Sequence, residues 1–96
     1  MLHQTHKTLA KEAAVIDRLV NIAAVVHPLM AMPQVYDIYT SHDVEGVSLA
    51  TWIGFMVVGF VFLAYGIAHR LRPIILTQIL WFVVDLLVIS GILYYR

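Results

Sequence analysis

The chain contains no cysteine and little charge, and each absence excludes a class of protein. Without cysteine, it has no disulfide framework, no thiolate metal ligands and no thiol nucleophile. Only 12% of its 96 residues are charged, whereas a soluble domain carries about a quarter. Six Lys and Arg balance six Asp and Glu, so the basic excess of a nucleic-acid-binding protein is missing. An ordinary cytosolic domain and a nucleic-acid partner are therefore excluded.

The apolar residues make up 61% of the chain and give a mean hydropathy of +0.86. They form three blocks separated by short polar breaks. A helix rises about 1.5 Å per residue and the hydrocarbon core is about 30 Å thick, so about 20 residues cross it. None of the blocks alternates apolar and polar residues as barrel strands do. We therefore predict an all-α integral membrane protein with helices at about 17–39, 47–68 and 73–95.

The first 14 residues are polar and compatible with a helix. They lack the order of a secretory signal peptide, in which a charged region precedes an apolar core and a small-residue cleavage site. We predict that residues 1–14 form a polar tail or an interfacial helix. Residues 15–96 are then a single three-helix transmembrane domain, whose short connections force neighbouring helices to run antiparallel.

Polar residues inside the blocks indicate where the interior lies. A charge facing lipid costs about 2.5 to 3.5 kcal/mol, so such residues normally face a cavity or a partner helix. Gln78, Trp81 and Asp85 are three and four residues apart and share one stripe of the third span. The second span has a stripe that mixes aromatic rings with glycines: Trp52, Phe55, Gly59, Phe62 and Gly66. Such stripes suit a sugar ring or an amino acid, and they also suit packing between helices.

Asp85 lies near the middle of its span, where a purely structural carboxyl is costly unless it is protonated or paired. The only candidate cation within the spans is His27. Asp85 is thus a candidate for solute binding or proton coupling, and His27 for proton coupling or simple packing. The spans hold no paired carboxylates, metal-ligand spacing or nucleophile motif. We therefore predict no enzyme activity, no cofactor and no metal.

The first span contains Pro28 and Pro33. Each proline removes a backbone donor and strains the preceding turn, so we predict a kinked helix. Gln34 beside Pro33 supplies an amide able to bond across helices.

The run Met32-Pro33-Gln34-Val35, followed by Gly46-Val47-Ser48 at the start of the second span, resembles the PQ-loop motif. Tyr65-Gly66-Ile67 and the run at 72–78 resemble the second and third helices of the bacterial SemiSWEET sugar transporters. The resemblance covers about residues 17–96. It implies a parallel homodimer of six helices in the bacterial cytoplasmic membrane, which moves a small polar solute, most readily a sugar, by alternating access. Pro33 would be the hinge.

The resemblance also implies a set of site residues. It places the sugar pocket at Phe62 and Gln78, where the family has Trp and Asn. Together with Trp81 and Asp85, these are the predicted substrate-binding residues. Tyr65 and His69 are candidates for a gate. Two alternatives remain: a proton-coupled carrier of amino acids or other small solutes that uses Asp85, and a membrane interaction protein whose stripes only pack against partner helices.

Two indications of orientation disagree. Most basic residues lie on the side of the N-terminus, namely Lys7, Lys11, Arg18, Arg70 and Arg72. Acidic residues, Asp37, Asp43 and Glu45, lie on the other side. The positive-inside rule therefore predicts a cytoplasmic N-terminus. The resemblance implies an external one.

Overall fold

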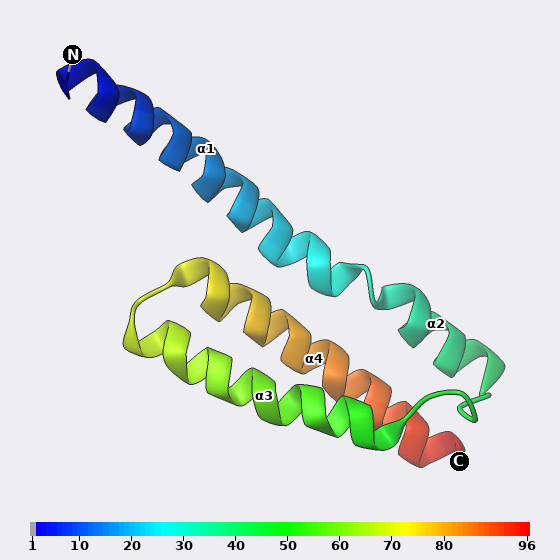
Figure 1. Cartoon of the computed structure of the whole chain (residues 1–96). Helices are drawn as coiled ribbons and strands as arrows, with labels where there is room; N and C mark the ends of the chain where they lie inside the picture. Colours follow the sequence, from blue (N-terminus) through cyan, green and yellow to red (C-terminus); the bar gives the residue numbers. More distant parts are fainter. Residues whose placement is uncertain (1) are drawn as a thin grey trace.

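The computed structural model describes residues 2–96, with side chains from residue 5 onward. The helices are α1 (Leu2–Leu29), α2 (Met32–Ser41), α3 (Leu49–Ala68) and α4 (Arg72–Tyr95) (Figure 1). Three segments of the described chain are long and apolar enough to cross a membrane: Thr5–Ser41, Leu49–Ala68 and Arg72–Tyr95. The predicted all-α fold with three spans is therefore confirmed.

The helices lie side by side, with α4 in the middle. Figure 1 shows α1 and α2 along one side of α4 and α3 along the other, and α4 packs against all three. The molecule measures 63 × 25 × 15 Å, so it is little thicker than one helix, whose diameter with side chains is about 10 to 12 Å. One such layer exposes both of its broad faces and has no room for an enclosed channel.

The first span is interrupted between α1 and α2. Pro33 lies in the first turn of α2 and has no N–H to donate to the carbonyl of Leu29, against which its ring would also clash. The chain instead makes a turn at Met30 and Ala31. There the Met30 N–H donates to Val26 O at 3.0 Å and the Ala31 N–H donates to Pro28 O at 3.1 Å. The predicted kink is thus present as a break in the helix.

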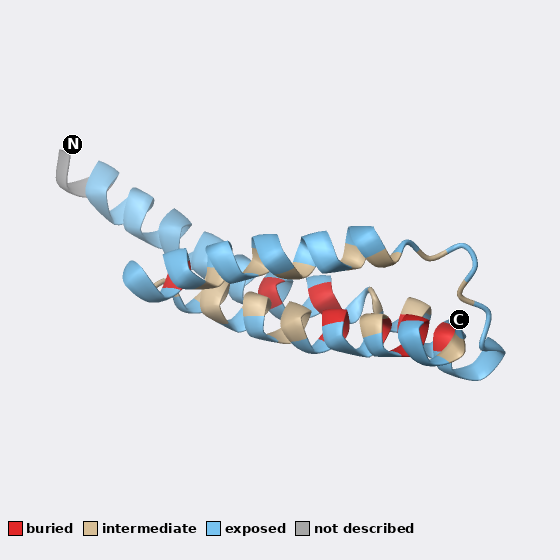
Figure 2. Ribbon diagram, turned by 90° about the horizontal axis from the view of Figure 1, so that it is seen from below, coloured by how far each residue is buried: buried red, intermediate tan, exposed pale blue. Residues whose placement is uncertain are grey.

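The contact between α2 and α4 contains most of the buried side chains (Figure 2). Its buried apolar residues are Val35 and Ile38 from α2, and Val84, Val88 and Ile92 from α4. The Tyr39 hydroxyl donates to Leu87 O at 2.8 Å across this contact. Gly91 allows the close approach, because a Cβ there would lie 2.5 Å from the Ile38 side chain. This end of the molecule is therefore tightly packed.

The hairpin of α3 and α4 closes through a left-handed residue, Arg70, with φ of 55°. The Arg70 N–H donates to Ile67 O at 3.3 Å and the Leu71 N–H donates to Gly66 O at 2.8 Å. Together these bonds form a Schellman motif, which satisfies the last carbonyls of α3. The turn brings the start of α4 against Gly66, where a Cβ would lie 3.0 Å from the Ile74 side chain.

Helix α1 is continuous from Leu2, so residues 2–14 belong to the same helix as residues 15–29. Residue 1 of the predicted tail lies outside the described residues. Among the described side chains of α1, only those of Ala24 and Pro28 are buried. A helix of 28 residues is about 42 Å long, and Figure 1 shows its N-terminal part extending beyond the α3–α4 turn. Helices α1 and α2 together are therefore longer than a bilayer crossing requires, and the N-terminal part of α1 is the extra length.

We expect Gly91→Ala to destabilise the protein and Gly54→Ala not to. Alanine favours a helix over glycine by about 1 kcal/mol at both positions. At Gly54 a Cβ meets nothing within 4 Å, whereas at Gly91 it overlaps Ile38. Overpacking of this kind costs about 1 to 3 kcal/mol. Thermal unfolding in detergent should give a lower apparent Tm for Gly91→Ala than for Gly54→Ala, and equal values would contradict this account of the contact.

Candidate functional site

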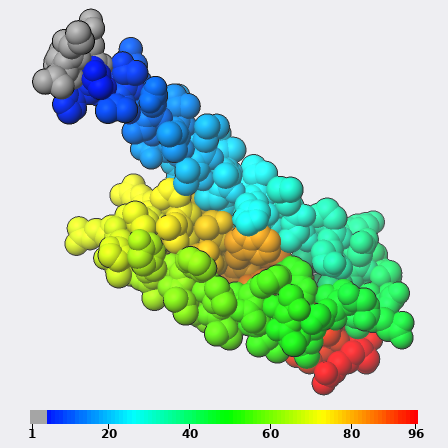
Figure 3. Space-filling view, viewed as in Figure 1, coloured from blue at the N-terminus to red at the C-terminus, as the bar shows by residue number. Residues whose placement is uncertain are grey.

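A groove of about 620 Å³ lies between α1, α3 and α4. The space-filling view shows the molecule hollowed there, with α4 as the floor between the end of α1 and α3 (Figure 3). Helix α3 contributes one wall through Trp52, Phe55, Val58 and Phe62, with Gly59 among them. Three helices that are distant in sequence thus border one space.

The wall from α3 is aromatic because Trp52, Phe55 and Phe62 are three and then seven residues apart, which places their rings on one face of the helix. Trp52 and Phe55 pack edge to face, with their ring centroids 5.4 Å apart. Phe55 and Phe62 remain half exposed within the single chain. The groove therefore offers apolar ring surface that the protomer does not cover.

The floor from α4 carries the polar residues of the third span. Gln78, Trp81 and Asp85 all line the groove. Gln78 lies close against α3, because Gly59 leaves space for its amide: a Cβ there would lie 3.2 Å from Gln78 Oε1. All four residues predicted to bind a solute, these three together with Phe62, therefore border the same space.

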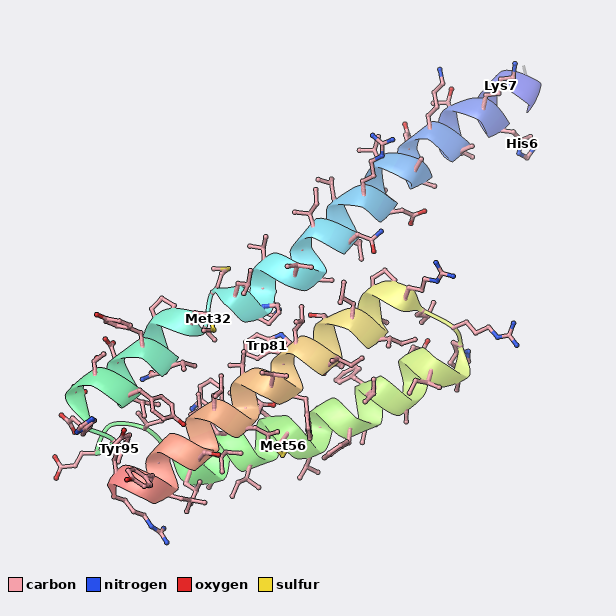
Figure 4. The ribbon with its side chains drawn as sticks, turned by 180° about the vertical axis from the view of Figure 1, so that it is seen from behind. His6, Lys7, Met32, Met56, Trp81 and Tyr95 are labelled. Carbon is pink, nitrogen blue, oxygen red and sulfur yellow. The ribbon has the colours of Figure 1, made fainter. Side chains whose placement is uncertain are left out.

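The third side of the groove comes from α1, just before the break. His27 packs against Trp81, with ring centroids 5.0 Å apart in an edge-to-face arrangement. Figure 4 shows Trp81 projecting from α4 into the space between α4 and the other helices, on the side of Met32. The ring contact of His27 with Trp81 thus joins the end of α1 to the floor of the groove.

Asp85 is the one buried charged residue among the described side chains, with 3% of its surface exposed. Its Oδ1 atom has no hydrogen-bond partner in the described part of the chain. His27 was the candidate cation for Asp85. Its ring faces Trp81 instead, and it forms no ion pair with Asp85. The groove therefore contains an unpartnered acceptor beside an amide and several aromatic rings.

The remaining candidates lie elsewhere. Pro33 borders a second, shallower depression on the outer side of α2, and Gln34 lines neither space. Tyr65 and His69 contact each other at the end of α3, with ring centroids 4.5 Å apart, and do not line the groove. Val58 does line it, although the sequence reasoning did not single it out. Val58 is three residues after Phe55 and four before Phe62, and this spacing was the signal that could have added it to the predicted groove residues.

Comparison with known proteins decides the family. No family model matches the chain. The sugar transporter SemiSWEET of Vibrio sp. (strain N418) is 30% identical to it over 80 residues, which cover 81% of this chain and 82% of that protein. The chain belongs to the SemiSWEET family. The resemblance read from its PQ-loop and Tyr-Gly motifs is therefore confirmed.

The fold agrees with this membership. A crystal structure of a bacterial homologue of SWEET transporters matches with a TM-score of 0.81, at 23% identity, over 85% of this chain and 99% of that one. Phe62 and Gln78 are the two positions at which the resemblance implies Trp and Asn in the family. Both side chains nevertheless border the groove, where Trp81 adds an indole from α4.

Proposed function

We propose that the protein is a membrane transporter of a small polar solute, and that a sugar is its main class of substrate. The observation that carries this proposal is the groove, in which an aromatic wall from α3 faces Gln78 and Asp85 on α4. The apolar faces of a sugar ring pack on aromatic rings, while its hydroxyl groups need amide or carboxylate partners. The volume of the groove, about 620 Å³, is within the usual range for small-molecule sites. The sugar-transporting relative supports the same class of solute.

The transporter works as a parallel homodimer. One protomer is a flat layer with a groove on its face, and the side chains of Phe55, Val58 and Phe62 are about half exposed there. A second copy, placed with its groove against the first, would cover this apolar surface and enclose a space that a single copy leaves open. Two copies, each with three membrane spans, also provide enough helices to surround a pathway across the bilayer. The resemblance of the sequence to the family implies the same arrangement.

Alternating access arises from movement of α1 about the break. Helix α2 is held on α4 by the Tyr39–Leu87 hydrogen bond and by the close contact at Gly91. Helix α1 also has two buried side chains, Ala24 and Pro28, but at the groove it meets α4 through the ring contact of His27 with Trp81 and not through a hydrogen bond. Rotation at Met30 and Ala31 would therefore move one wall of the groove while α2 and α4 stay together. Pro33 acts as the hinge because it prevents the two helices from joining.

Reconstituted protein should exchange labelled sugar in proteoliposomes, and Gln78→Ala should exchange it more slowly. Loss of one hydrogen bond of 0.5 to 1.5 kcal/mol corresponds to up to about a tenfold loss of affinity. Ile79→Ala is the matched control, because Ile79 is the next residue of α4, is half exposed and does not line the groove. Absence of exchange for every sugar and amino acid, with a well-folded dimer in the vesicles, would refute the transporter proposal.

Pro33→Ala should slow exchange without weakening solute binding. The new N–H can donate to Leu29 O and let α1 continue into α2, since proline disfavours a helix interior by about 3 kcal/mol. Half of that energy already corresponds to about a tenfold change in rate. Pro73→Ala is the control, because Pro73 lies in the first turn of α4, where proline interrupts nothing. Binding followed by tryptophan fluorescence and exchange followed by labelled solute separate the two effects. An unchanged exchange rate would remove Pro33 as the hinge.

A further inference from the structure

One group in the groove, the Asp85 carboxyl, can accept a hydrogen bond from a sugar hydroxyl, but a neutral sugar offers no partner for its negative charge. The Asp85 carboxyl is buried to 3% exposure and its Oδ1 atom has no partner among the described residues. An aromatic wall and the Gln78 amide already suit a ring with hydroxyl groups. A carboxylate in an apolar environment is costly unless a cation pairs with it. Apart from a proton on the carboxyl itself, a cationic solute is the remaining source of that positive charge.

The chain offers no cation of its own at this place. The Lys and Arg residues of the described chain lie at helix ends or in the N-terminal part of α1, and none of them lines the groove. His27 is the only basic side chain that does, and its ring packs on Trp81. Asp85 therefore meets no charged side chain of the groove, and it lines space that a ligand can enter.

The surroundings of Asp85 suit an ammonium group. Trp81 precedes it by four residues, so the two side chains are neighbours on one face of α4. Trp52 adds a second indole to the same groove. Ammonium groups are bound by aromatic faces within about 6 Å, most strongly by Trp, and by carboxylates. Both kinds of partner are present here.

We propose that this groove selects a solute that carries a protonated amine on a sugar ring, with Asp85 as the counter-ion of the amine. This inference rests on the proposed transport function and names its substrate class. The Cα atoms of Gln78 and Asp85 are about 10 Å apart along α4, since the helix rises 1.5 Å per residue. With both side chains reaching inward, one monosaccharide fits between them. Its hydroxyl groups meet Gln78, its ring lies along Trp81 and its amine meets Asp85.

The test uses competition for sugar exchange in proteoliposomes at a mildly acidic pH. Unlabelled glucosamine, which is cationic there, is compared with glucose and with the neutral N-acetylglucosamine against labelled glucose. A charge-assisted hydrogen bond should make glucosamine the better competitor by about tenfold or more. Asp85→Asn keeps the shape of the side chain and should remove this preference. Asp37→Asn, an exposed carboxyl on α2 outside the groove, should keep it.

The outcomes distinguish this inference from the transport function. If glucose is exchanged and the three sugars compete equally, the amine preference is wrong and the transporter remains. If a pH gradient drives neutral sugar and Asp85→Asn abolishes that drive without any preference for glucosamine, Asp85 binds a proton, which also overturns the inference. If no solute is exchanged, tryptophan fluorescence in detergent still compares the binding of glucosamine and N-acetylglucosamine. Should Asp85→Asn fail to fold, the comparison of these two sugars on the unaltered protein decides.

Discussion

The cost of placing a polar side chain in hydrocarbon determines how this small chain is organised. The third span carries an amide and a carboxyl, Gln78 and Asp85, and lies between the other helices, where neither group has to face lipid. Helix α4 is consequently the centre of the layer, and its polar stripe becomes the floor of the groove. A layer one helix thick leaves that floor open on one side. The need for a second copy follows from this geometry.

Helix α4 contacts α2 toward its C-terminus and α1 toward its N-terminus, and the two contacts differ in kind. Toward its C-terminus, α2 is held by a buried apolar cluster, by the Tyr39 hydroxyl and by the absence of a side chain at Gly91. Toward its N-terminus, α4 packs against α1, which buries Ala24 and Pro28 and whose His27 meets the Trp81 ring. The break between α1 and α2 lies between these two contacts. In the proposed mechanism α1 moves as one wall of the groove while α2 stays on α4, which is the arrangement that a carrier requires.

Periodicity and composition were enough to predict the three spans and the stripe of Gln78, Trp81 and Asp85, because residues three and four apart must share a helix face. Contacts between distant segments were not predictable. The edge-to-face contact of His27 with Trp81 and the bond from Tyr39 to Leu87 depend on how the helices are docked. Gly66 shares the helical stripe of the groove residues, yet the turn of the hairpin places it against Ile74. Local pattern thus predicts a face but not what covers it.

The central claim is that the groove is a water-filled pathway for the solute. The sequence contains no cysteine, so single cysteine variants can test this directly. Val57 and Val58 are neighbours on α3 with 58% and 53% of their surfaces exposed, and only Val58 lines the groove. Single Val58→Cys and Val57→Cys variants are treated in proteoliposomes with a water-soluble thiol reagent, and sugar exchange is then measured. The account predicts that the reagent modifies Val58→Cys and blocks its exchange, while Val57→Cys is unaffected. Full exchange by completely modified Val58→Cys protein would contradict it.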